Sequence, residues 1–273
     1  METSMSDTAP QSRPSVPRMY DYVLGGSHHL PVDREAMEQV RRMMPEVEDV
    51  AWANRGFLQR ASRWLAAEAG IRQFLDIGAG LPTVNNTHDV VRKEVPGARV
   101  AYVDNAPEFE EVAGPLVAGL DGVAAVRGDL RDPEGVLGDP AVRTVIDFDQ
   151  PVGLLVVAVL HLVSDEDDPY GAVARYLEAL PSGSYLALPH GTRDKQADRG
   201  VRALSTAFRQ AASQFHPRSR AEVERFFEGL EIVPPYHDAE PKLCFLGEWA
   251  AEDCEAADSD GSRWGYAAVG RKP

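Results

Sequence analysis

"QFLDIGAGLPTVNNTH", residues 73–88, joins an apolar run to an acid and to two closely spaced glycines. An apolar run of this length, bounded by glycines, predicts a buried strand more readily than a helix. Gly78 and Gly80 let the backbone approach a ligand closely, and the helix expected to follow offers free N–H groups and a positive dipole end. The stretch is therefore either a tight turn between a strand and a helix or the floor of a nucleotide site.

The chain on both sides of this stretch alternates apolar strands with amphipathic helices. Further strands are predicted at 98–105, 123–130, 151–163, 183–190, 230–235 and 264–272, and helices at 47–69, 108–120, 170–180, 199–215 and 219–230. Strands that are almost continuous in Val and Leu are typical of a parallel sheet covered on both faces. The sequence thus predicts an α/β fold, a doubly wound, mostly parallel sheet behind an N-terminal helical extension.

Composition divides the chain into segments. Residues 1–17 are rich in Ser, Thr and Pro, bury too little apolar surface to offset the entropy of ordering, and are predicted to form a flexible tail. Residues 18–69 are predicted to form the helical extension, which also acts as a lid, and residues 70–273 the α/β domain. Within that domain, residues 237–263 are acidic and lack a regular hydrophobic period, so we expect an inserted surface loop there.

Charge and hydropathy limit the partners. A formal net charge of -15 disfavours a nucleic-acid substrate, because it repels a phosphate backbone. No apolar run reaches the roughly 18 to 20 residues needed to span a bilayer, and the N-terminus lacks the apolar core of a signal peptide. Cys244 and Cys254 are spaced neither as a redox pair nor as a zinc knuckle. We therefore expect a cytoplasmic protein with no nucleic-acid or membrane partner.

An acid stands at the end of each of the first three strands of the α/β domain, where ligands of doubly wound sheets bind. Asp76 lies two residues before the first glycine. An anion is unfavourable there beside a pyrophosphate, but it suits a cationic group such as the ammonium of S-adenosylmethionine. Thr83 stands where the G-x-G-x-x-G pattern of dinucleotide-binding folds has its third glycine. Both positions favour S-adenosylmethionine over NAD.

The next two strand ends extend this pattern. Asp104 follows Gly80 by 24 residues, at the place where a carboxylate accepts both ribose hydroxyls. Asp129 ends the third strand and is predicted to accept from the adenine amino group, while the backbone N–H of Leu130 donates to a ring nitrogen. The alternative for Asp129 is a surface ion pair with neighbouring arginines, Arg131 among them.

These motifs together resemble a known family. "FLDIGAG", "YVDN", "GDLRDP", "LLVVAVLHLV" and "GSYLALPH" occur in the order typical of class I S-adenosylmethionine-dependent methyltransferases. With "YDYVLGG", "VDRE", "ANRGFLQRA", "HLVSDEDDP" and "AAVGRKP", the chain from about Pro17 to Pro273 is similar to the bacterial S-adenosyl methyltransferase family, formerly a domain of unknown function. The resemblance implies S-adenosylmethionine as cofactor and a Rossmann-like sheet of seven strands, the last antiparallel.

The resemblance also implies roles for residues by position. Asp76 or its water shell holds the methionine ammonium, the two glycines allow close backbone approach, and Asp104 binds the ribose. The predicted cofactor-binding residues are Asp76, Gly78, Gly80, Asp104, Asn105, Asp129 and Leu130.

Histidines supply the candidate catalytic group. His161 is predicted to close the fourth strand, where a substrate meets the methyl group, and an imidazole is suited to act as general base near neutral pH. The alternative is a structural histidine bonded to backbone. His28 and His29 are adjacent and have no third ligand at readable spacing, so no metal is expected. The lid and substrate candidates are Tyr20, Tyr22, Gly25, Gly26 and His190.

The favoured function is methyl transfer from S-adenosylmethionine to a small molecule by in-line displacement, in which the protein mainly aligns the reactants and excludes water. The alternative is a non-catalytic module that binds S-adenosylmethionine or S-adenosylhomocysteine for regulation. An NAD-dependent oxidoreductase is disfavoured by Asp76 and Thr83. The sequence indicates neither the methyl acceptor nor the oligomeric state.

Overall fold

The structure is a computed structural model, and it describes residues 13–82 and 85–273. The predicted flexible tail, residues 1–17, therefore lies mostly outside the described residues. Its last two residues belong to helix α1 (Val16–Val23), in which Pro17 occupies the first turn. A proline fits there because the first N–H groups of a helix have no intrahelical partner.

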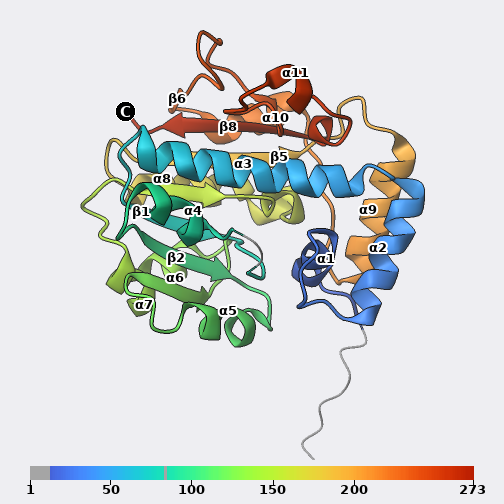
Figure 1. Cartoon of the computed structure of the whole chain (residues 1–273), viewed down its shortest axis with the longest axis horizontal. Coiled ribbons are helices and arrows are strands. Elements are labelled where there is room, and N and C mark those ends of the chain that lie inside the picture. The colour runs from blue at the N-terminus through green and yellow to red at the C-terminus, as the bar shows by residue number, and fades with distance from the viewer. Residues whose placement is uncertain (1–12, 83–84) are drawn as a thin grey trace, which may run out of the picture.

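One sheet forms the centre of the molecule (Figure 1). Its strands are β1 (Gln73–Ile77), β2 (Arg99–Asp104), β3 (Val123–Arg127), β4 (Gly153–Val156), β5 (Tyr185–Gly191), β6 (Glu231–Ile232), β7 (Cys244–Phe245) and β8 (Gly265–Arg271). The order is β3-β2-β1-β4-β5-β8-β6, and β7 pairs with β8 off this path. Strands β1 to β5 pair with one another in parallel, whereas β8 runs antiparallel to β5 and β6.

This topology confirms the predicted Rossmann-like, mostly parallel fold with an antiparallel last strand. The part of the chain that the structure describes adds one strand to the predicted seven, the two-residue β7, which lies in the segment expected to be a loop. Strand order reverses at β1, which pairs with β2 on one side and β4 on the other. A ligand crevice is expected at such a switch point, beyond the carboxyl ends of these strands.

Each face of the sheet carries its own core, as expected for a doubly wound domain. Phe74 and Leu75 are neighbours on β1, so their side chains point to opposite faces. Phe74 packs with α3 (Val47–Ala67), α4 (Thr87–Glu94) and α5 (Phe109–Val117). Leu75 packs with the opposite set, which consists of α6 (Pro133–Gly138), α7 (Pro140–Val145) and α8 (Pro169–Ala179).

A third core lies at one end of the sheet, the end toward which the parallel strands point (Figure 1). It joins α1, α2 (Pro31–Met43) and the first turns of α3 to α9 (Asp198–Gln210). The predicted N-terminal extension is thus packed against a helix from the middle of the α/β domain. The remaining described helices are α10 (Arg220–Glu224), α11 (Cys254–Ala257), η1 (Leu160–Leu162), η2 (Asp165–Asp167), η3 (Arg225–Phe227) and η4 (Ser262–Trp264).

The prediction of a surface loop at 237–263 is wrong for its middle part. Trp249 is 1% exposed and packs edge-on against Phe57 and Trp64 of α3. Arg60 of α3 donates to three backbone carbonyls of the segment, including that of Trp249 at 2.6 Å. The apolar residues that anchor this segment are few and irregularly spaced. Their burial therefore could not be predicted from a regular hydrophobic pattern in the sequence.

One buried arginine anchors the N-terminal helix through ion pairs. Arg18 on α1 donates from Nε to Asp33 on α2 at 2.7 Å and from Nη1 to Glu108 at 2.9 Å. Arg18 is 5% exposed, and the Asp33 side chain is fully buried. Glu108 precedes α5 and follows the carboxyl end of β2, so this ion-pair set links the N-terminal helices to the switch-point side of the sheet.

We expect Arg18→Ala to lower the free energy of unfolding by about 3 to 5 kcal/mol, because it leaves two desolvated carboxylates without their cation. Arg41→Ala is the matched control, since Arg41 also pairs with two carboxylates, Glu38 and Glu48, but in exposed positions. It should cost less than about 1 kcal/mol. Urea unfolding of both variants measures the difference, and equal losses would contradict a structural role for the buried set.

Candidate functional site

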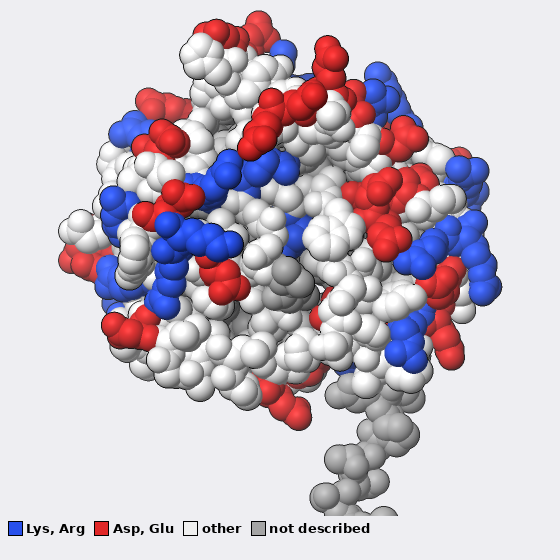
Figure 2. Space-filling model, in the orientation of Figure 1, with Lys and Arg blue, Asp and Glu red and all other residues white. Residues whose placement is uncertain are grey.

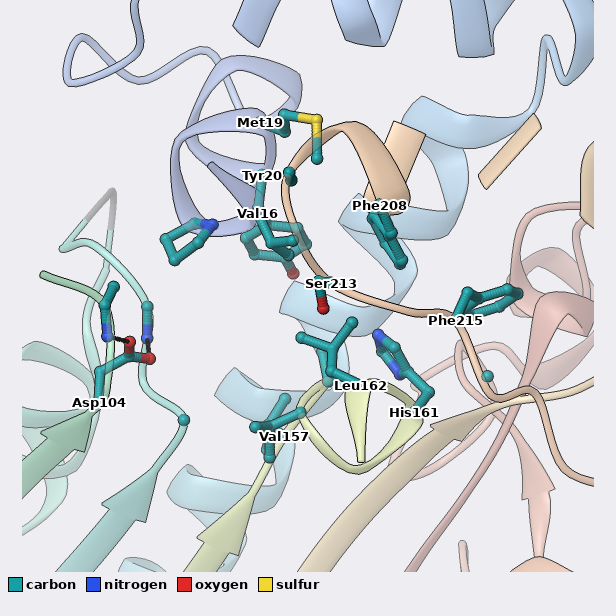
Figure 3. Close-up of a pocket in the computed structure, with 18 of the residues that line it drawn as sticks. Val16, Met19, Tyr20, Asp104, Val157, His161, Leu162, Phe208, Ser213 and Phe215 are labelled. Carbon is teal, nitrogen blue, oxygen red and sulfur yellow. Dashed lines mark hydrogen bonds between the residues drawn. The ribbon is translucent and has the colours of Figure 1, made fainter. Parts of the chain in front are cut away.

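A cavity of about 1000 Å³ opens at the carboxyl ends of the parallel strands. This is the upper end of the size range of small-molecule sites. Residues that follow β1, β2, β3 and β4 line one half, and residues of α1, α2, α3 and α9 line the other half. Figure 3 shows this space, with α1 and the end of α9 facing the strand ends.

The two glycines of the opening stretch are required for different structural reasons. Gly78 has φ 71° and Gly80 has φ 65°, both in the left-handed region that favours glycine. A Cβ on Gly78 would lie 2.4 Å from Val159, whereas a Cβ on Gly80 would meet no atom within 4 Å. Gly78 is therefore needed for close packing, and Gly80 for a turn beside open space. Thr83, at the position of the absent third glycine, lies outside the described residues.

Asp76, at the end of β1, is a buried acid on the cavity wall. It is 3% exposed and accepts a hydrogen bond of 2.6 Å from the hydroxyl of Thr87. Burial raises its pKa to about 6, although the Thr87 hydrogen bond and the positive charge of Arg55 act in the opposite direction. The ionised form of this carboxyl group is thus only partly compensated by the protein, and a cation in the cavity would stabilise it further.

Asp104, at the end of β2, joins two loops. One carboxylate oxygen accepts the backbone N–H of Gly80 and the other accepts that of Ala106, each over 2.8 Å (Figure 3). Burial raises the pKa of this group, while the two N–H groups lower it. The carboxylate that was predicted to bind the ribose thus lies next to the glycine loop, on the cavity wall.

The residues after β3 complete this half of the cavity. Asp129 accepts two hydrogen bonds from the Arg131 guanidinium, at 2.9 and 2.6 Å, and one from Asn105 at 3.1 Å. The Arg131 hydrogen bond lowers the Asp129 pKa to about 2. Asp129 thus forms the ion pair considered as an alternative, and it also lines the cavity. The neighbouring Leu130 is buried, and its backbone N–H donates to no group within 13–82 or 85–273.

The two candidate histidines differ in their hydrogen bonding. His190 is 1% exposed, its Nδ1 lies 2.8 Å from the Gly191 carbonyl, and its Nε2 lies 2.8 Å from Nη1 of Arg218. An arginine nitrogen only donates, so Nε2 accepts and Nδ1 carries the proton. Burial lowers the His190 pKa well below its usual value. Because both ring nitrogens already form hydrogen bonds, His190 has a structural role in the cavity wall.

His161 does not end a strand, contrary to the prediction. β4 stops at Val156, Ala158 turns to φ 57°, and His161 lies in the 3-10 helix η1. Neither of its ring nitrogens bonds to a group of the described chain, and Nδ1 is buried. Burial lowers the His161 pKa to about 4, with smaller contributions from the nearby charges of Arg218 and His216. The imidazole is therefore neutral at neutral pH.

The predicted lid residues separate into two groups. Tyr20 lines the cavity, where its hydroxyl accepts from Asn54 at 2.8 Å. Tyr22 bonds instead to Glu38 at 2.7 Å, away from the cavity, and neither Gly25 nor Gly26 lines it. These glycines form the turn after α1. The lining residues that the sequence missed include Met19, Leu162, Phe208, Ser213 and Phe215.

Comparison with known proteins identifies the family. The sequence profile of the S-adenosyl methyltransferase family matches residues 2–273. The chain belongs to the S-adenosyl methyltransferase family. It is an S-adenosylmethionine-dependent methyltransferase, as the strand-end acids and the combined motifs predicted. A search of curated proteins found no match.

Solved structures agree with this family. A DUF574 family protein from Streptomyces avermitilis is 40% identical, with a TM-score of 0.88 over 96% of this chain and 98% of that chain. A Thermobifida fusca protein is 34% identical, with a TM-score of 0.87 over 98% of this chain and 99% of that chain. OxaC, solved with S-adenosylhomocysteine and oxaline, is 15% identical, with a TM-score of 0.50 over 80% of this chain and 47% of that chain, and is similar in fold alone.

Over the described ranges, no helix combines the length and apolar character needed to cross a bilayer. The same residues contain no group of three His, Cys, Asp or Glu side chains placed to hold a metal ion. On the face drawn in Figure 2, acidic and basic side chains are interspersed rather than separated into a basic surface.

The glycines provide a test of the loop. Gly78→Ala should lower the free energy of unfolding by about 2 to 5 kcal/mol. Alanine is strained in the left-handed backbone region, and its Cβ would also overlap Val159, so both effects destabilise the folded state. Gly80→Ala is the matched control, with the same type of φ and no overlap, and should cost about 1 to 2 kcal/mol. Urea unfolding compares them, and an equal or larger loss for Gly80→Ala would refute this assignment.

Asp76 provides a test of the electrostatics. Its folded pKa of about 6 exceeds that of the unfolded chain, so the folded state retains a proton that the unfolded state has lost. Its contribution to stability is therefore lost as pH rises through about 4 to 6. We expect Asp76→Asn, relative to the wild type, to gain about 2 kcal/mol between pH 4.5 and 7.5. Urea unfolding at both pH values measures this, and a pH-independent difference would contradict the assignment.

Proposed function

We propose that the protein transfers the methyl group of S-adenosylmethionine to a small molecule bound in the same cavity, by in-line displacement. The observation that carries the proposal is the Asp104 carboxylate, held by two backbone N–H groups beside Gly80 and open to the cavity. A fixed acid at the end of the second strand suits a pair of ribose hydroxyls.

The other strand ends fit the remaining parts of the cofactor. Asp76 is a buried acid for the methionine ammonium or its water shell, and its raised pKa is consistent with a site that lacks its cation. The free N–H of Leu130 would donate to an adenine nitrogen. Asp129 and Asn105 already bond to each other, and Asp129 also pairs with Arg131, so a contact with the adenine amino group would share these acceptor oxygens.

The bound cofactor would supply an activated methyl group on a sulfonium. The protein's part is then to align the acceptor and to exclude water. The cavity suits a small molecule, because helices α1, α2 and α9 enclose the half that lies beyond the strand ends. We further infer that the N-terminal segment is a lid. Met19 and Tyr20 line the cavity, and Arg18 fastens the helix to Glu108.

The cofactor assignment is tested by calorimetry with S-adenosylmethionine. Asp104→Ala should weaken binding by about 100-fold or more, because the cofactor would lose two hydrogen bonds to a charged acceptor. Asp104→Asn keeps the size of the side chain and should also weaken binding. Asp149→Ala removes an exposed acid outside the cavity and should leave the affinity unchanged.

Thermal unfolding of each variant establishes that it is folded. Undiminished binding by folded Asp104→Ala, or no binding by the intact protein, would refute the cofactor site. Binding without formation of S-adenosylhomocysteine from any acceptor would favour the non-catalytic binding module.

A further inference from the structure

The half of the cavity beyond the strand ends has aromatic walls. Phe208 on α9 and Phe215 after it contact each other edge to face, with ring centroids 5.6 Å apart. His161 lies parallel to Phe208, with an interplanar angle of 9°, and edge-on to Phe215. Met19 and Leu162 lie around the same space (Figure 3). Flat and polarisable walls of this kind favour a planar ring over a branched or saturated ligand.

The part of this half around Phe208 and Phe215 carries no ionised side chain of its own. Of the described residues, the lining from η1, α9 and 211–216 includes no Asp, Glu, Lys or Arg. An ammonium or carboxylate placed there would lose water without gaining a counter-ion, which costs several kcal/mol. Acids and arginines of the cavity lie instead near the strand ends and the Arg18 set. The lining therefore selects an acceptor that is uncharged when it binds.

His161 is the polar group of this half that has an unmet hydrogen-bonding requirement. Its Nδ1 is buried without a partner in the described chain, whereas both nitrogens of His190 are occupied. The imidazole points into the space between Leu162, Ser213 and Phe208 (Figure 3). Nε2 also lacks a partner in the described chain and, unlike Nδ1, is not enclosed by protein atoms, so a ligand in the cavity can supply its partner.

We propose, on the basis of the function proposed above, that the methyl acceptor is an uncharged aromatic hydroxyl compound whose ring packs against Phe208 and Phe215 and whose proton passes to His161. In this step the acceptor O–H bond breaks and its proton moves to the imidazole, while the oxygen forms a bond to the methyl carbon. The carbon–sulfur bond breaks, its electron pair stays on sulfur, and the sulfonium becomes a neutral thioether. One positive charge thus moves from sulfur to the imidazole.

The protonation states are consistent with this step. A phenolic hydroxyl has an ordinary pKa near 10, so it enters the cavity protonated and uncharged. The lowered pKa of His161 keeps its imidazole neutral and able to accept a proton at neutral pH. It also lets the imidazolium lose its proton quickly once the product leaves.

Four compounds with related ring systems test the acceptor class. They are 2-naphthol, 2-naphthylmethylamine, 2-naphthoic acid and decahydro-2-naphthol, which vary the charge of the acceptor and the planarity of the ring. The assay measures formation of S-adenosylhomocysteine at saturating S-adenosylmethionine. We expect kcat/KM for 2-naphthol to exceed that of each other compound at least tenfold. Equal or faster reaction of the amine, the acid or the saturated alcohol, or no reaction of 2-naphthol, would overturn the proposal.

His161→Gln tests the proton transfer. We expect kcat with 2-naphthol to fall by about 100-fold or more, the usual size of a general-base effect, with the Kd for S-adenosylmethionine within twofold of wild type. His237→Gln changes an exposed histidine outside the cavity and should leave kcat unchanged. If folded His161→Gln keeps more than a tenth of the wild-type kcat, the role of His161 is refuted. Failure of the intact protein to bind the cofactor would refute the proposed function instead.

Discussion

One carboxylate, that of Asp104, accepts backbone N–H groups from two separate loops, at Gly80 and at Ala106. A buried carboxylate is stable only if such donors compensate the loss of water. The loop after β1 supplies its donor from Gly80, which takes a left-handed conformation. Strand pairing of β1 with β2 sets the distance between the loops, so the fold, the glycine and the acid depend on one another.

Asp76 and Asp104 are both buried, yet they are compensated to different degrees. Asp104 accepts from two backbone N–H groups, whereas Asp76 accepts from the hydroxyl of Thr87. The pKa of Asp76 accordingly rises to about 6. Such an acid lowers the stability of the empty protein at neutral pH and strengthens binding of a cation at the same place. A cost in stability at a binding site is the usual consequence of arranging charge before the ligand arrives.

The sequence predicted those parts of the molecule that depend on local pattern. Strand-end acids and the two glycines could be located because β1 to β3 follow a simple order of strand, turn and helix. His161 was misplaced because the turn at Ala158, with φ 57°, ends β4 within an apolar run that reads as one strand. Trp249 was missed because its burial depends on contacts with α3, far away in the sequence. Likewise, Phe208 reads as a core residue of a helix, and only the tertiary packing of α9 brings it to the cavity.

The cavity divides according to charge, and this division is consistent with the chemistry proposed for it. The strand-end half contains carboxylates that favour a cation, and the part of the helical half around Phe208 and Phe215 is apolar apart from uncharged polar groups such as His161 and Ser213. A sulfonium at the boundary would lose its positive charge as the methyl group leaves. With a neutral acceptor and a neutral imidazole in the apolar half, that charge would pass to the imidazole as a proton, and the imidazole can release the proton to water. An acceptor that was already charged would have to be desolvated before the reaction, with no counter-ion in the part around Phe208 and Phe215 to compensate it.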